Sequence, residues 1–251
     1  MIAPPKEPDY SVDEWGHHKA DVMVSPAGAL LLAGPPPLLL GAAMIRWSPS
    51  PAAVSLGWAV LITGSFFLAE ALLMIRSNRT GKLAVRDRVL DALGLAGNEV
   101  VLDLGCGHGL FLIGAAKRLL AGRAVGIDFW STVDQKDNRR EATLANASLE
   151  GVADRVELHD GDMRTLPFSD DSFDVVTACL AIHNIADRDG RRQAVAEAYR
   201  VLKPGGKIAF VDFAKTAEYA ADLRVLEAKD VACSGLSFQI FPPVRIVTAR
   251  K

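Results

Sequence analysis

The sequence predicts an α/β fold, a doubly wound parallel sheet, preceded by a hydrophobic helical hairpin. Short β-rich runs alternate with helical stretches from about residue 79 onward, and two long uncharged stretches precede them. The 251 residues suit one large domain, or one domain with an appendage. The net charge of -2 gives no reason to expect a nucleic-acid partner. The mean hydropathy of +0.18 is high for a chain that is 23% charged, which indicates a local apolar excess.

The apolar excess lies in residues 22–75. No charged residue occurs between Asp21 and Arg46, nor between Arg46 and Glu70. Because about 20 apolar residues cross a bilayer core as a helix, we predict two hydrophobic helices, transmembrane or re-entrant. Residues 1–21 form a polar or interfacial segment ahead of them. A buried core helix pair and a secretory signal are the alternatives, and the signal fits poorly with so acidic and proline-rich a start.

The first of these stretches is interrupted by three prolines at 35–37, which can begin a helix but not continue one. A broken or re-entrant span and a clean span are therefore both open for residues 22–46. Basic residues follow the second stretch closely: Arg76, Arg79, Lys82, Arg86 and Arg88. The positive-inside rule then predicts a cell-membrane location, with the domain of residues 76–251 in the cytoplasm.

Within that domain, β-rich runs alternate with helical stretches. The expected strands are 100–104, 124–128, 155–159, 173–177 and 207–213, and the expected helices are 110–120, 138–150 and 191–201. Such alternation is typical of a parallel sheet with helices on both faces. Runs at 237–241 and 244–249 flank Pro242 and Pro243, and they predict a hairpin at the sheet edge, where proline is tolerated.

A glycine-rich turn follows the first expected strand, with the sequence Asp-Leu-Gly-Cys-Gly-His-Gly over residues 103–109. Glycine lets the backbone turn sharply and lets a ligand approach closely. A dinucleotide fingerprint would need a third glycine at position 110, which is Leu110. The spacing therefore disfavours a nicotinamide cofactor. A tight turn without a ligand is the alternative.

Residues 100–109 resemble the first motif of the class I S-adenosylmethionine-dependent methyltransferases. Residues 166–176 and 197–207 are similar to the branch that includes the ubiquinone/menaquinone-biosynthesis methyltransferases. The resemblance covers about residues 99–211, with several motifs in the family's order. It implies a Rossmann-like seven-stranded sheet, a transferase activity and S-adenosyl-L-methionine as cofactor. It says little about the acceptor, because these motifs bind the methyl donor.

The resemblance also implies cofactor contacts. The first-motif acid and glycines hold the amino-acid end of the cofactor, Asp128 resembles the acid that binds the ribose, and Phe129 matches the residue that packs on the adenine. Asp162 and Met163 resemble the segment that reads the adenine edge. The full expected set is Asp103, Gly105, Cys106, Gly107, Asp128, Phe129, Asp162, Met163 and Cys179. For Cys179, a buried small residue is the favoured interpretation over a thiol nucleophile.

Methyl transfer from a sulfonium is an in-line displacement that gains mainly from positioning, and it needs a base only when the acceptor must lose a proton. His183 follows the fourth strand at the edge where such sheets bind ligands, so it is the candidate base or acceptor-orienting residue. A histidine that ties down its loop is the alternative. Further candidates for acceptor binding are His17, His18 and Trp130. Three widely spaced cysteines predict no metal site.

Together these observations predict a membrane-anchored methyltransferase whose partners are the bilayer and a small or lipophilic acceptor. The acceptor classes are a quinone, a lipid, and a hydrophobic thiol or phenol. One alternative is a thiol or chalcogen methyltransferase that acts on a small soluble metabolite. Alternatives from other classes are an NAD-dependent oxidoreductase and a non-catalytic membrane binding module. The sequence predicts no oligomeric state.

Overall fold

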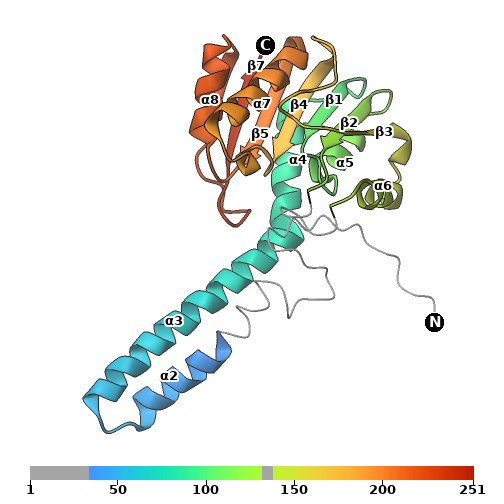
Figure 1. Cartoon of the computed structure of the whole chain (residues 1–251). Coiled ribbons are helices and arrows are strands. Elements are labelled where there is room, and N and C mark those ends of the chain that lie inside the picture. Colours follow the sequence, from blue (N-terminus) through green and yellow to red (C-terminus); the bar gives the residue numbers. More distant parts are fainter. Residues whose placement is uncertain (1–33, 132–137) are drawn as a thin grey trace, which may run out of the picture.

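A computed structural model describes residues 34–131 and 138–251. Its centre is a seven-stranded sheet with the strand order β3-β2-β1-β4-β5-β7-β6 (Figure 1). The first five strands along the chain run parallel to one another, and β7 is antiparallel to both of its neighbours. This sheet, with helices on both faces, confirms the predicted Rossmann-like α/β fold.

The five parallel strands follow the apolar runs of the sequence. They are β1 (Val100–Leu104), β2 (Arg123–Asp128), β3 (Val156–Asp160), β4 (Phe173–Cys179) and β5 (Leu202–Asp212). Four of the five residues of β1 are buried, as expected for a central strand that is covered on both faces. The carboxyl ends of these strands lie at one edge of the sheet, which we call the carboxyl edge.

The carboxyl-terminal hairpin differs from the prediction. It pairs β6 (Lys229–Cys233) with β7 (Arg245–Arg250), so the prediction of a strand at 237–241 was wrong. That segment belongs to the connecting loop and forms one isolated bridge, to Val244. Strand β6 was not predictable because this edge strand has no buried residue and therefore no alternating pattern.

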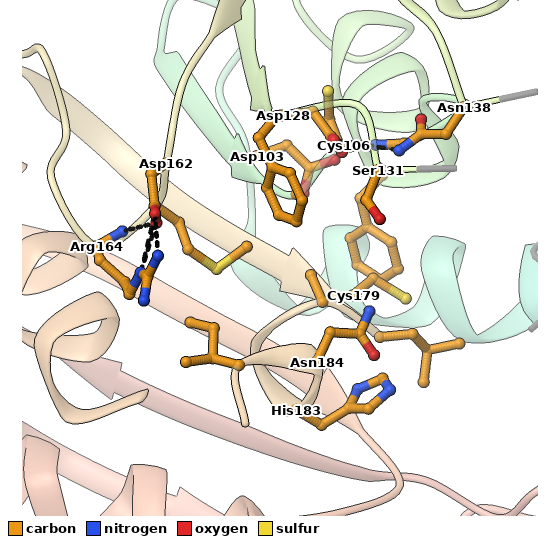
Figure 2. A pocket seen from close by; sticks show the side chains of 18 of the residues that line it. Asp103, Cys106, Asp128, Ser131, Asn138, Asp162, Arg164, Cys179, His183 and Asn184 are labelled. Atoms are coloured by element: carbon orange, nitrogen blue, oxygen red, sulfur yellow. Dashed lines mark hydrogen bonds and ion pairs between the residues drawn. The ribbon is translucent and has the colours of Figure 1, made fainter. Parts of the chain in front are cut away.

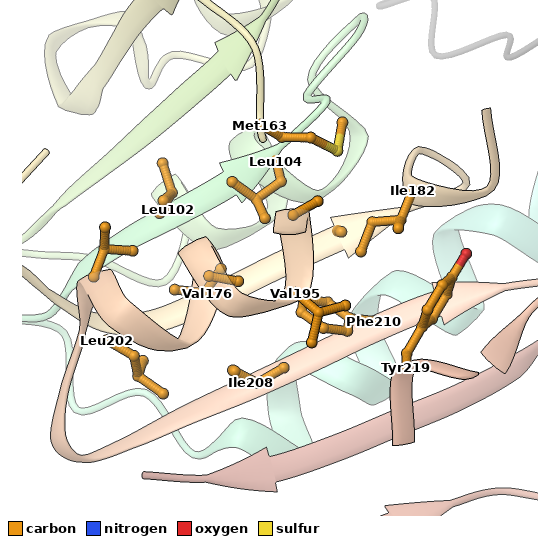
Figure 3. Close-up of a cluster of buried hydrophobic side chains, with 14 of the residues drawn as sticks. Leu102, Leu104, Met163, Val176, Ile182, Val195, Leu202, Ile208, Phe210 and Tyr219 are labelled. Carbon is orange, nitrogen blue, oxygen red and sulfur yellow. The ribbon is translucent and has the colours of Figure 1, made fainter. Parts of the chain in front are cut away.

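Helices cover both faces of the sheet. They are α4 (Lys82–Leu93), α5 (Leu110–Ala116), α6 (Arg140–Leu149), α7 (Arg188–Val201) and α8 (Thr216–Val225). Side chains of α4 and α5 belong to one buried apolar cluster, and those of α7 and α8 belong to the other. Figure 3 shows the second cluster, in which Val195 and Tyr219 lie against side chains of the central strands.

Two apolar helices precede this domain. They are α2 (Pro35–Trp47), which has prolines in its first turn as predicted, and α3 (Pro51–Arg76). Helix α3 continues through a π-helical turn, Ser77–Gly81, into α4. Among the described residues, the continuous helix Pro51–Leu93 is the one long and apolar enough to cross a membrane, and 11% of its most apolar window is buried. Residues 22–33 of the first predicted stretch lie outside the described residues.

Helices α2 and α3 lie side by side and contact each other through glycine (Figure 1). A Cβ atom on Gly41 would lie 2.7 Å from the carbonyl oxygen of Gly57, and one on Gly64 would lie 2.9 Å from that of Gly34. These distances leave no room for a larger side chain, so the two backbones approach each other closely. The large apolar side chains point away from the contact: Leu39, Leu40, Leu56, Trp58, Ile62, Phe66, Leu72 and Leu73.

Candidate active site

A pocket of about 440 Å³ opens at the carboxyl edge of the sheet (Figure 2). Most of the expected site residues line it: Asp103, Gly105, Cys106, Gly107, Asp128, Phe129, Asp162, Met163, Cys179 and His183. They come from the carboxyl ends of β1, β2 and β4 and from the segments that follow β1–β4, which converge there because the strands are parallel. His17 and His18 lie outside the described residues.

The turn between β1 and α5 needs its glycines for two reasons. Gly105, Gly107 and Gly109 all have positive φ angles, of 62°, 48° and 88°. In addition, a Cβ atom on Gly105 would lie 2.6 Å from the Cβ of Ala181 across the pocket. Glycine therefore both permits the turn and lets the segment after β4 approach it closely.

Asp103 is a buried carboxylate at the bottom of this pocket, 2% exposed. It accepts hydrogen bonds from the Thr177 hydroxyl, at 2.7 Å, and from the Leu112 backbone N–H, at 3.0 Å. Burial raises the pKa of Asp103, the nearby Asp128 charge adds to this effect, and the two hydrogen bonds oppose it, which leaves the pKa at about 7. Among the described residues Asp103 forms no ion pair, so a cation bound beside its carboxylate would have no competing partner to displace.

Asp128 ties the glycine turn to the segment after β2. One carboxylate oxygen accepts from the Gly107 backbone N–H at 2.8 Å, and the other accepts from the Trp130 backbone N–H at 2.7 Å and from the Asn138 amide at 3.2 Å. The Trp130 side chain lies outside the pocket lining, since its indole N–H donates to Asp160 at 2.7 Å. Asn138 also lines the pocket, and it was not predicted from the sequence.

Arg164 is a further pocket residue that was not predicted from the sequence. Its guanidinium holds the Asp162 carboxylate, with contacts of 2.6 and 2.9 Å to the same oxygen (Figure 2). This partner lowers the pKa of Asp162, so the carboxylate stays ionised. Phe129 is 58% exposed at the rim, which leaves its ring free to cover a planar group.

His183 lies on the opposite side of the pocket, in the short helical turn after β4. Its Nδ1 atom is 2.9 Å from an oxygen of Asp212, at ion-pair distance but without the alignment of a hydrogen bond. The Phe213 ring packs on the imidazole with its centroid 4.4 Å away.

Burial raises the pKa of the Cys179 thiol, and the Asp103 and Asp212 charges raise it further. The thiol therefore stays neutral, which supports a structural role for this cysteine rather than a nucleophilic one.

The α3–α4 junction lies at the same edge as the pocket. The Ser77 hydroxyl accepts a hydrogen bond from the Phe241 backbone N–H at 2.9 Å. Phe241 belongs to the loop before β7, and the first residue of β7, Arg245, pairs with Asp212, the last residue of β5. The apolar helices therefore leave the domain at its carboxyl edge (Figure 1), which is the edge at which the pocket opens.

Comparison with known proteins fits this geometry. A family profile described as a methyltransferase domain matches residues 102–210. A demethylmenaquinone methyltransferase of Lactiplantibacillus plantarum is 38% identical over 124 residues, which are 49% of this chain and 48% of that protein. A chloroplastic 2-phytyl-1,4-beta-naphthoquinone methyltransferase of Arabidopsis thaliana is 35% identical over 49% of this chain and 45% of that protein. The chain thus spans about half the length of these curated relatives.

Among solved structures, a geranyl diphosphate C-methyltransferase of Streptomyces coelicolor, in complex with S-adenosyl-L-homocysteine, has the same fold. The TM-score is 0.54, with 15% sequence identity, over 66% of this chain and 75% of that one. The profile match and the pocket agree, since the matched segment begins within β1 and supplies the glycine turn, Asp128, Asp162 and His183. Residues 102–210 therefore match a methyltransferase domain, and the fold around them is that of a methyltransferase solved with S-adenosyl-L-homocysteine.

Proposed function

We propose that this protein is a membrane-anchored methyltransferase that transfers the methyl group of S-adenosyl-L-methionine to a lipophilic acceptor reaching the pocket from the bilayer. The observation that carries the proposal is the shared edge: the apolar helices leave the domain on the side where the donor pocket opens. An acceptor embedded in the membrane would then approach the pocket without leaving the lipid surface.

The residues of the pocket fit the donor. Gly105 lines the pocket at the glycine turn, and Asp103 is an acceptor buried beside it for the amino-acid end. Asp128 would accept the ribose hydroxyls, Phe129 would cover the adenine, and Asp162 would accept its amine. The cofactor supplies an activated methyl group. The chain supplies the positioning, which contributes about 7–11 kcal/mol in favourable cases.

The packing of α2 and α3 supports insertion into a membrane. Ile62 is 65% exposed and Phe66 is 63% exposed, while Gly41 and Gly57 form the contact between the helices. A helix pair in water would bury its large apolar side chains. Lipid imposes no such demand, and helices in membranes pack through small residues instead. Helix α3 has 26 residues and so is about 39 Å long, which exceeds a hydrocarbon core of about 30 Å.

Two further observations support a lipophilic acceptor. The curated relatives described above are named for naphthoquinone or menaquinone substrates, and one of these names includes a phytyl tail. In addition, the loop between β6 and β7 exposes Leu236 and Phe238, at 50% and 69%, on the carboxyl edge. We assign His183 to the acceptor side of the pocket, as the group that orients the acceptor or takes its proton.

The test compares two acceptors with the same reacting ring. The full chain in lipid nanodiscs receives S-adenosyl-L-methionine and a naphthohydroquinone that has either a long isoprenoid tail or none. Because each buried CH₂ group contributes about 0.8 kcal/mol, one isoprene unit suffices for a kcat/KM at least about tenfold higher with the tail. Equal or better methylation of the tail-free ring would overturn the lipophilic acceptor. If the protein transfers no methyl group either to lipid extracts or to soluble thiols, the proposed methyltransferase activity is wrong.

A further inference from the structure

Behind His183 stand two buried polar residues that the donor site does not use. Asp212 ends β5, and Tyr219 lies in the first half of α8. The Tyr219 hydroxyl donates to one Asp212 oxygen at 3.1 Å, and the other Asp212 oxygen is 2.9 Å from Nδ1 of His183. The three side chains thus form a line from the interior of the domain to the pocket.

Because these three side chains are buried, the negative charge of Asp212 must be compensated within the protein. Tyr219 is fully buried, Asp212 is 2% exposed, and the His183 side chain is 12% exposed. A buried carboxylate is costly unless a cation or hydrogen bonds compensate it. The Tyr219 hydroxyl supplies one hydrogen bond, and an imidazolium at His183 would supply the cation. Other ionisable groups that interact with Asp212 or with its two neighbours are Cys179, Arg191 and Glu218, and Lys82 in turn acts on Cys179.

Tyr219 cannot take over the proton-accepting role. Burial raises the pKa of its hydroxyl, and the Asp212 charge raises it further, so the residue stays a neutral donor. It therefore fixes the orientation of the Asp212 carboxylate. The Asp212 charge beside Nδ1 then favours the His183 tautomer with its proton on that nitrogen, by electrostatic attraction rather than by an aligned hydrogen bond, and this leaves Nε2 with the free lone pair.

We infer that Asp212 and Tyr219 are positioning residues that make His183 a general base, and that the acceptor is therefore one that must lose a proton, such as a phenolic hydroxyl or an acidic C–H. In the step, Nε2 of His183 takes the acceptor's proton, and the acceptor's electron pair forms the new bond to the methyl carbon. The carbon–sulfur bond breaks, its electron pair stays on sulfur, and S-adenosyl-L-homocysteine leaves as a neutral thioether. The imidazolium rests beside Asp212 and then returns its proton to water.

This inference rests on the proposed function, and an acidity series separates the two. The native chain and Asp212→Asn are assayed in nanodiscs with naphthols whose ring substituents lower the hydroxyl pKa stepwise to below the assay pH. A positioned base contributes about 10²–10⁴-fold, so the variant is expected to be about 100-fold slower with the least acidic acceptor. The gap should close toward unity for acceptors that are already ionised.

The split between kcat and KM gives a second readout. Loss of the positioned base should lower kcat for the least acidic acceptor, while the affinity for S-adenosyl-L-homocysteine stays unchanged. Asp222→Asn is the matched control, since Asp222 is also a buried carboxylate, 5% exposed, and pairs with Arg188 outside the pocket. It should leave both quantities unchanged. Tyr219→Phe should slow the least acidic acceptor several-fold and leave S-adenosyl-L-homocysteine affinity unchanged.

The possible failures are distinguishable. If the native chain methylates no acceptor, the proposed function falls and the inference falls with it. If the native chain methylates naphthols, but Asp212→Asn slows every acceptor equally or none at all, the positioning role is wrong and the methyltransferase stands. Should Asp212→Asn fail to bind S-adenosyl-L-homocysteine, the acidity series on Tyr219→Phe decides, because a merely structural loss would slow all acceptors alike.

Discussion

The raised pKa of Asp103 predicts that donor binding depends on pH. The free carboxyl titrates at about 7 because it is buried, whereas a cation bound beside it lowers that pKa again. Binding at pH 6 must therefore remove a proton from most molecules, and binding at pH 7.5 from about a quarter of them. If the pKa in the complex falls below 5, the dissociation constant should be about eightfold larger at pH 6 than at pH 7.5. Affinity rises with pH because the bound state carries fewer protons.

Isothermal titration of S-adenosyl-L-methionine into the full chain at both pH values measures this ratio. The ligand's α-amino group titrates near 8, so most of it stays cationic at both pH values. Buffers of different ionisation enthalpy should report proton release at pH 6. The control is Asp103→Asn, whose amide can still accept from Leu112 N–H and donate to the Thr177 hydroxyl. It should bind more weakly, with no dependence on pH in this range. An eightfold ratio that persists in the variant, or a native ratio near one, would show that Asp103 does not make donor binding depend on pH.

The remaining predictions concern packing and cysteine chemistry. Gly81→Ala would push a methyl group into the carbonyl oxygen of Gln239, so overpacking should lower the free energy of unfolding by about 1–3 kcal/mol in urea titrations. A Cβ on Gly235 would have no atom within 4 Å, so Gly235→Ala should change the free energy of unfolding by less than about 0.5 kcal/mol. Equal effects of the two substitutions would contradict the close packing at Gly81. Iodoacetamide at pH 7.5 should alkylate the exposed Cys233 well before Cys179, as read by peptide mass spectrometry, and early labelling of Cys179 would contradict its raised pKa.

The parts of the fold that follow apolar patterning were predictable, and the parts that depart from it were not. The parallel strands β1–β5 read as short apolar runs because both faces of each are covered. Helix α8 gave no such signal, since it buries Thr216 and Asp222 alongside its apolar residues. The long helix through residue 93 was also missed, because its polar turn at Ser77–Gly81 resembles a break.

The candidate site divides in the same way. Asp103 and Asp128 were predictable because each lies in a recognisable segment at or near the end of a strand. Arg164 and Asp212 act on their partners through contacts made by folding, and spacing along the chain does not indicate such contacts. One signal was present for Asp212: it is an acid at the end of an apolar parallel strand, as Asp128 is, and so it had to lie at the carboxyl edge.

The central claim is that the pocket methylates an acceptor taken from the bilayer. The most direct measurement supplies the full chain, in nanodiscs, with methyl-deuterated S-adenosyl-L-methionine and both the lipid and the aqueous extract of the same cells. Mass spectrometry then locates the labelled methyl group. We expect the label in a compound of the lipid extract. The Asp128→Ala variant, which lacks the proposed ribose contact, should not label that compound. Label confined to water-soluble metabolites would contradict it.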